Sequence, residues 1–206
     1  IRMKRSVFLF PLLITLLLWG CGKYLIPLEG KLEKSTANGL RLLSSDSPNL
    51  AVYLEPEMAK KIIMKKADGA TCGHAETEIP VGRALSNAIV EGLRMAFPKM
   101  IIVDRPERPR DYMLLKIGAE KIEIRFEYSA MARCEVPKMD QGRISVALVT
   151  QIINLDNQPV LDGTLNFQEE EVDREIPPSS QSGVLEKCLN RIVTKFVKEI
   201  KPKIKA

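Results

Sequence analysis

The stretch VLEKCLNRIVTKFVKEI, residues 184–200, decides the fold of this chain. Its apolar residues recur at steps of three and four, the spacing that places side chains on one side of an α-helix. The stripe consists of Val184, Leu185, Cys188, Leu189, Ile192, Val193, Phe196, Val197 and Ile200. A lone helix cannot bury such a stripe, so the pattern predicts a sheet or a second helix to pack against.

A second helix is predicted at residues 81–97. Its apolar residues recur at the same steps: Val81, Leu85, Ala88, Ile89, Leu93 and Ala96. Pro80 precedes the pattern and Pro98 stops it, as expected because proline is tolerated at a helix start and not in its interior. The chain therefore contains two amphipathic helices that need an apolar surface to cover.

From Tyr112 the apolar residues follow the two-residue period of a β-strand. One face holds Leu115, Ile117 and Ala119, and the next holds Ile122, Ile124, Phe126 and Tyr128. The phase slips by one residue at Glu120-Lys121, which predicts a β-bulge. Further strands are predicted at residues 50–54, 100–104, 144–155 and 160–169, with the turn formers of a hairpin at 154–159.

These elements predict an α+β fold. Both helices bury their stripes at once if they pack on the same side of a sheet. We therefore expect a two-layer sandwich of a mainly antiparallel sheet with two long helices packed on one face. Residues 50–206 have the size of a single domain.

The N-terminal segment resembles the signal peptide of a bacterial lipoprotein. It has three basic residues, then an apolar run at residues 7–19, and a lipobox, Leu18-Trp19-Gly20-Cys21. The apolar run is shorter than the roughly 20 residues that a spanning helix needs. The resemblance implies cleavage between Gly20 and Cys21, diacylglycerol on the sulfur of Cys21, and a further acyl chain on the new amine.

Two or more acyl chains anchor a protein stably, so the membrane is an expected partner through Cys21. In enteric-type bacteria an aspartate after this cysteine retains a lipoprotein in the inner membrane. Gly22 stands there instead and favours the periplasmic face of the outer membrane. The predicted domains are a signal peptide at 1–20, a lipidated cysteine with a flexible tether at 21–49, and a single periplasm-facing domain at 50–206. Within the tether, residues 40–43 could form a short strand or dock on the domain.

The net charge does not indicate a nucleic-acid partner. The full chain carries 31 Lys and Arg against 26 Asp and Glu, a formal charge of +5. Removal of residues 1–20 takes away three of those basic residues, leaving 28 against 26 and a charge near +2. Aromatic residues are only 5% of the chain, and none alternate with basic residues as stacking platforms would require.

Three cysteines remain after Cys21. Cys188 lies on the apolar stripe of the last helix and should behave as a small hydrophobic residue. Cys72 and Cys134 lie in loop-like contexts and are candidates for a disulfide, which an oxidising periplasm permits. A metal site at Cys72 and His74 is the alternative, but two residues fall short of the usual three or four ligands. We therefore expect no metal and no other cofactor.

No catalytic set is visible in the sequence. His74 is the only histidine, and Cys72 is too close to it in sequence for the usual separated geometry of a nucleophile and its base. The glycines lack the lysine and helix that complete a phosphate-binding loop. The acidic run Glu169-Glu170-Glu171 is interpreted as a solvated strand end. We expect no enzymatic activity.

The order of elements resembles the YajG group of small bacterial lipoproteins over residues 50–200. Lipoproteins of the LptE type and transport auxiliary lipoproteins share a similar plan. The resemblance implies a non-catalytic envelope lipoprotein, an accessory in outer-membrane assembly or an envelope transport machine that binds an envelope protein. A lipid or small-molecule binder with a pocket between helices and sheet is the alternative, and a hydrolase would need a polar cleft.

One structural feature should separate the first two functions. A cavity lined by Leu93, Met95, Ile124 and Phe126 would favour lipid binding. A dry core with an exposed edge strand would favour a protein partner through strand addition.

Overall fold

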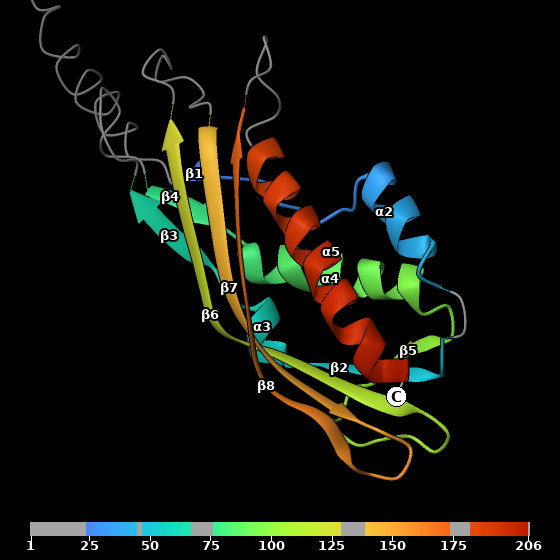
Figure 1. Ribbon diagram of the computed structural model, residues 1–206. Helices are drawn as coiled ribbons and strands as arrows, with labels where there is room; N and C mark the ends of the chain where they lie inside the picture. The colour runs from blue at the N-terminus through green and yellow to red at the C-terminus, as the bar shows by residue number, and fades with distance from the viewer. Residues whose placement is uncertain (1–23, 45–46, 67–75, 129–138, 174–181, 206) are drawn as a thin grey trace, which may run out of the picture.

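Figure 1 shows the computed structural model of the chain, which describes residues 24–44, 47–66, 76–128, 139–173 and 182–205. The elements are β1 (Tyr24–Leu25), α2 (Lys34–Arg41), β2 (Leu50–Leu54), α3 (Pro56–Ala59), β3 (Ile63–Lys66), β4 (Glu76–Ile79), α4 (Val81–Ala96), β5 (Met100–Ile102), β6 (Met113–Tyr128), β7 (Met139–Ile153), β8 (Pro159–Val172) and α5 (Gly183–Lys205). Within the described residues, no helix combines the length and the apolar character needed to cross a membrane.

The main sheet has five strands in the order β5-β2-β6-β7-β8. The short strands β5 and β2 run parallel to each other and to β6. The long strands β6, β7 and β8 form an antiparallel meander that bends along its length (Figure 1). Together with α4 and α5 this sheet confirms the predicted α+β sandwich.

The predicted bulge is present on β6. The register of β6 against β7 shifts between Ala119 and Lys121, so the apolar residues on both sides of the shift face the helices. The amine of Lys61 donates hydrogen bonds to the carbonyl oxygens of Ala119 at 2.7 Å and Glu120 at 3.2 Å. The bulge thus has a partner for the carbonyl groups that a regular ladder would have occupied.

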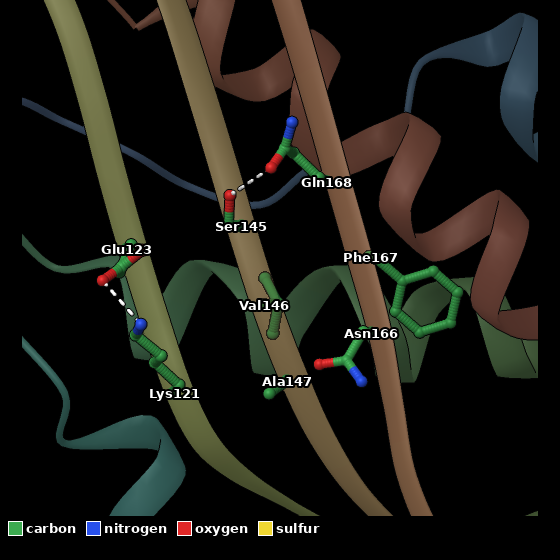
Figure 2. Close-up of a pocket in the computed structure, with 8 residues that line it drawn as sticks. All are labelled: Lys121, Glu123, Ser145, Val146, Ala147, Asn166, Phe167 and Gln168. Atoms are coloured by element: carbon green, nitrogen blue, oxygen red, sulfur yellow. Dashed lines mark hydrogen bonds and ion pairs between the residues drawn. The ribbon is translucent and has the colours of Figure 1, made fainter.

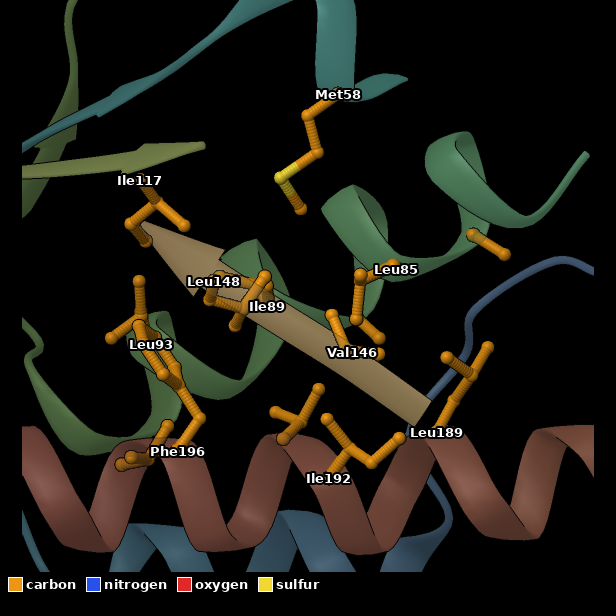
Figure 3. Close-up of a cluster of buried hydrophobic side chains, with 14 of the residues drawn as sticks. Met58, Leu85, Ile89, Leu93, Ile117, Val146, Leu148, Leu189, Ile192 and Phe196 are labelled. Atoms are coloured by element: carbon orange, nitrogen blue, oxygen red, sulfur yellow. The ribbon is translucent and has the colours of Figure 1, made fainter. Parts of the chain in front are cut away.

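The core lies between the main sheet and the two long helices. Figure 3 shows Leu85, Ile89 and Leu93 of α4 and Leu189, Ile192 and Phe196 of α5 meeting around β7. The two helices cross closely at Gly92, where a Cβ would lie 2.5 Å from Cγ1 of Val193. Both predicted stripes are therefore buried against the sheet and against each other.

The N-terminal part of the predicted tether is folded, and this corrects the sequence-based prediction for residues 24–44. Strand β1 pairs in parallel with β4, which also pairs with β3 to make a second, three-stranded sheet. Ile26, Leu28 and Leu40 are almost fully buried, at 1%, 2% and 1% exposure. Of the two possibilities for residues 40–43, the structure has docking, since α2 packs on α4 and α5.

Candidate binding surface

The residues that the sequence singled out for chemistry mostly lie outside the described part of the chain. This holds for Gly20, Cys21, Cys72, His74 and Cys134. Cys188 is described, and it is fully buried as a free thiol. Burial raises its pKa to about 12, so it is protonated and unreactive at neutral pH. Among the described residues, no three His, Cys, Asp or Glu side chains are placed to hold a metal ion.

The four side chains proposed to line a lipid pocket are used for packing. Leu93, Ile124 and Phe126 belong to the buried core. Met95 lies against α2, where Nε of Arg41 is 3.2 Å from its sulfur. Leu93, Ile124 and Phe126 are only 0%, 6% and 5% exposed.

All three residues of the acidic run on β8 are paired, Glu169 and Glu171 with α5 and Glu170 with Arg143 of β7, which corrects the interpretation of the run as a solvated strand end. Glu169 and Glu171 point to the helix side, where Glu169 pairs with Lys195 and Glu171 pairs with Arg191. Lys187 lies 3.9 Å from Glu171. The three basic residues are four apart on one side of α5, so they form a continuous row beside β8.

On the opposite face of the main sheet, the part of the chain that the structure describes places no helix, and the side chains there are mainly polar. Side chains that alternate with the core residues line a shallow groove of about 300 Å³ across β6, β7 and β8 (Figure 2). They are Lys121, Glu123, Ser145, Ala147, Asn166 and Gln168. Small and amide side chains at the centre leave the backbone of three strands accessible along this groove.

Charges on this outer face are balanced locally. Lys121 pairs with Glu123 at 2.8 Å, and a hydrogen bond to that lysine lowers the pKa of Glu123. Glu170 accepts hydrogen bonds from Arg143 and Gln141, and the bond from Arg143 is the main cause of its lowered pKa. The groove is therefore ionised but nearly neutral at physiological pH, and suits hydrogen bonding more than attraction of one sign of charge.

A strap formed by residues 29–33 crosses α4 and α5 on the side away from the sheet. Side chains of the two helices hydrogen-bond to its backbone. Four strap N–H groups donate to them: Glu29 (2.7 Å) and Gly30 (3.1 Å) to Glu186, Leu32 to Glu91 (3.1 Å), and Glu33 to Asn190 (2.8 Å). Two strap carbonyls accept from side-chain amides at 3.2 Å each, that of Lys31 from Asn190 and that of Glu29 from Asn87. Gly30 has a φ of +72°, and a Cβ there would lie 1.9 Å from the carbonyl oxygen of Ala84. Only glycine fits this contact.

The carboxyl group of Glu186, which binds the strap, has a raised pKa. Burial raises its pKa above the usual 4.5, and the N–H groups of Glu29 and Gly30 oppose that shift in part. Its Oε2 is buried and has no hydrogen-bond partner among the described residues. The strap is thus held by a carboxylate that is costly to keep ionised.

Sequence reasoning missed the groove and the strap for different reasons. The groove residues occupy the polar positions of the alternating pattern, so the pattern contains them but does not mark them as a site. Glu186 and Asn190 occupy polar positions of the last helix. Nothing in the sequence indicates that a segment some 150 residues away would use them as hydrogen-bond partners.

Comparisons with known proteins assign no family to this chain. No protein-family model matches it, and no curated protein matches it. A DUF330 protein from Xanthomonas campestris is 13% identical with a TM-score of 0.40, covering 88% of this chain and 96% of its own. A minor lipoprotein from Acinetobacter baumannii is 9% identical with a TM-score of 0.40, covering 75% and 94%. The rare lipoprotein B from Shewanella oneidensis is 10% identical with a TM-score of 0.29, covering 75% and 89%. Likeness at this level settles neither family nor function.

Proposed function

We propose that this chain is a lipid-anchored envelope lipoprotein that acts without catalysis, by binding a protein partner. The observation that carries this proposal is the uncovered outer face of the main sheet. Helices α4 and α5 pack on the other face, while the groove of Figure 2 leaves three strands open to a partner. An accessory role in outer-membrane assembly or in an envelope transport machine fits such a surface.

The position of Cys21 limits how far the first described strand would lie from the membrane. Cys21 precedes the first described residue, Tyr24, by three positions, and an extended chain spans at most about 3.3–3.6 Å per residue. A lipid on Cys21 would therefore hold Tyr24, at the start of β1, within roughly 10 Å of the headgroups, and Glu29, the first residue of the strap, within roughly 29 Å.

Lipidation is tested by replacing Cys21 with serine in the full chain. The expected product is an unprocessed precursor that incorporates no labelled palmitate, because no thiol remains to receive the lipid that licenses cleavage. The matched control is Cys188→Ser, which leaves the lipobox intact and should be processed and labelled normally. Normal acylation and mature size in Cys21→Ser would disprove the anchor.

Binding through the groove is tested with a photo-crosslinking amino acid placed in the full chain in intact membranes. At position 147 it lies in the groove, and at position 198 it lies on the exposed side of α5. We expect a discrete protein adduct from position 147 and none from position 198. Equal adducts from both positions, or none from position 147, would contradict the assignment of the groove.

A further inference from the structure

The two edges of the main sheet differ in how they are protected. Strand β5 has three residues and is followed by Asp104, Arg105 and Pro106, features that prevent another strand from pairing there. Strand β8 has 14 residues, and its stretch 163–168 contains no charge and no proline. Long edges of this kind normally carry a lysine, a proline or a bulge at the centre. The centre of the β8 edge therefore lacks the features that normally prevent pairing with another strand.

The free backbone groups of β8 can be assigned to particular residues. In an antiparallel ladder the N–H and C=O of one residue point to the same side, and the side alternates along the strand. The carbonyl of Glu170 accepts a hydrogen bond from Arg191 of α5 at 3.1 Å, so this residue faces away from β7. The same parity gives free N–H and C=O groups at Asp162, Thr164, Asn166 and Gln168. In the described part of the chain, no strand pairs with this side of β8.

Apolar side chains beside this edge are incompletely covered. Leu161, Leu165 and Phe167 point to the helix side, yet all three are only half-buried. Gly163 lies between them, and a Cβ built there meets no atom within 4 Å. An added strand with apolar residues on the same face would cover this row and fill the space beside the glycine.

From these features we infer that β8 pairs antiparallel with β8 of a second copy of this chain, with Leu165 on the twofold axis. Thr164 then lies opposite Asn166 of the second copy, and Asp162 opposite Gln168, so all four free residues form hydrogen-bonded pairs. On the helix side Leu165 meets its own copy, and Phe167 lies beside the open Gly163. An aromatic residue opposite an edge glycine is a favourable cross-strand pair. The two sheets become one continuous sheet.

Charge selects this register over its neighbours. Moving the axis one residue toward the C-terminus places Asp162 opposite Glu170, and like charges directly opposite are destabilising. Parallel in-register stacking would place the acidic run 169–171 of one copy on that of the next. Moving the axis one residue toward the N-terminus places Gln168 opposite Val160 of the second copy. Val160 lies outside the regular ladder, because the register of β8 against β7 shifts near Pro159.

The paired dimer also allows both copies to be anchored in the same membrane. Its twofold axis is perpendicular to the joined sheet, so both straps lie on the same side of the dimer and both grooves on the other. The inference does not depend on lipidation, because it rests on the edge alone. It also leaves the groove of each copy open, so failure of one proposal does not imply failure of the other.

The test uses two differently tagged full-length copies produced together and purified through one tag in detergent. We expect the wild-type copies to co-purify. The double variant Thr164→Lys/Asn166→Lys should lower the co-purified fraction at least about tenfold, because it places lysines opposite each other twice across the axis. The control Val149→Lys adds one lysine to the same face on the neighbouring strand β7 and should co-purify normally. Wild-type copies that do not co-purify, or a double variant that does, would overturn the inference.

A crosslink provides a positive test that does not require a destabilised variant. In the variant Leu165→Cys the new thiol should form a disulfide with that of the second copy, because non-hydrogen-bonded antiparallel pairs have Cα atoms about 4.5 Å apart. The control is Asn166→Cys, whose copy lies diagonally at about 7–8 Å, beyond disulfide reach. Mass spectrometry should find the 165–165 linked peptide and little of the 166–166 peptide. The reverse pattern would disprove the register, and no linked peptide at either position would disprove the pairing.

Discussion

Truncation of Phe196 should show whether the apolar stripe of α5 holds the domain together. Phe196 is fully buried, and its ring meets Phe167 of β8 edge-to-face at a centroid distance of 6.1 Å. A buried phenylalanine removes about 150–250 Å² from water. At about 25 cal/mol per Å² this corresponds to roughly 4–6 kcal/mol, of which alanine retains a part. Phe196→Ala should therefore lower the free energy of unfolding by about 3–5 kcal/mol.

The neighbouring Lys195 is not a suitable control for Phe196→Ala. From the helical pattern, Lys195 lies off the apolar stripe and its truncation should change little. In the structure Lys195 pairs with Glu169, whose side chain is only 9% exposed. Lys195→Ala would leave that carboxylate buried without its cation. Because Lys195 itself is 59% exposed, we expect a loss of only about 1–2 kcal/mol.

Lys198→Ala is the matched control, because Lys198 is exposed on the same helix. Thermal unfolding of the purified chain, followed by circular dichroism, should give the order Lys198→Ala, Lys195→Ala, Phe196→Ala from the highest Tm to the lowest. For a chain of this size about 1 kcal/mol corresponds to roughly 2–4 °C, so Phe196→Ala should melt about 6–20 °C below the control. Equal Tm values for Phe196→Ala and Lys198→Ala would refute the packing argument.

Two further predictions concern Glu186, which binds the strap, and the residues Cys72, His74 and Cys134. The raised pKa of Glu186 means that the folded state holds its proton more tightly than the unfolded state, so this group's contribution to stability is greatest at acid pH and is lost as pH rises through the folded pKa. Glu186→Gln should flatten the pH dependence of urea unfolding above about pH 4.5 relative to the exposed control Glu199→Gln, and an unchanged profile would show that Glu186 is not desolvated. His74→Ala should leave any envelope phenotype of the gene intact, and joint replacement of Cys72 and Cys134 should act only through stability. Loss of the phenotype in a folded, correctly located His74→Ala protein would make a catalytic or metal role the leading hypothesis.

The parts of the fold that the sequence predicts are those with a regular period. The stripes of α4 and α5 and the alternation on β6, β7 and β8 each bury one face of their element, so the period appears directly in the residue order. The bulge is visible for the same reason, since it shifts the phase at Glu120-Lys121 while the buried face stays the same. The hairpin turn is predicted because Asn154 accepts hydrogen bonds from the N–H groups of Asp156 and Gln158, as turn-forming asparagines do.

Residues 24–33 could not be predicted because their structure depends on partners elsewhere in the chain. The strap has no period, and its backbone groups are satisfied by side chains of α4 and α5 instead of by a ladder of its own. Its one irregular dihedral, at Gly30, reflects the proximity of Ala84, which no local pattern reports. The acidic run was misread for a related reason. The cations that pair with Glu169 and Glu171 lie on α5, about 20 residues away in the sequence. They are spaced four residues apart and reach these carboxylates only because the folded helix lies beside the strand.

Helix α5 connects the strap to the acidic end of the β8 edge. Its apolar stripe fills the core, a second row (Lys187, Arg191 and Lys195) holds the acidic end of β8, and Glu186 and Asn190 hold the strap. Because the three rows belong to one helix, the strap and the β8 edge keep a fixed relation to each other. A lipid on Cys21 would then set the orientation of the β8 edge on the membrane, as well as the distance of the domain from it. This relation requires a bound strap, since an unbound one would return residues 21–33 to the flexible tether that their sequence resembles.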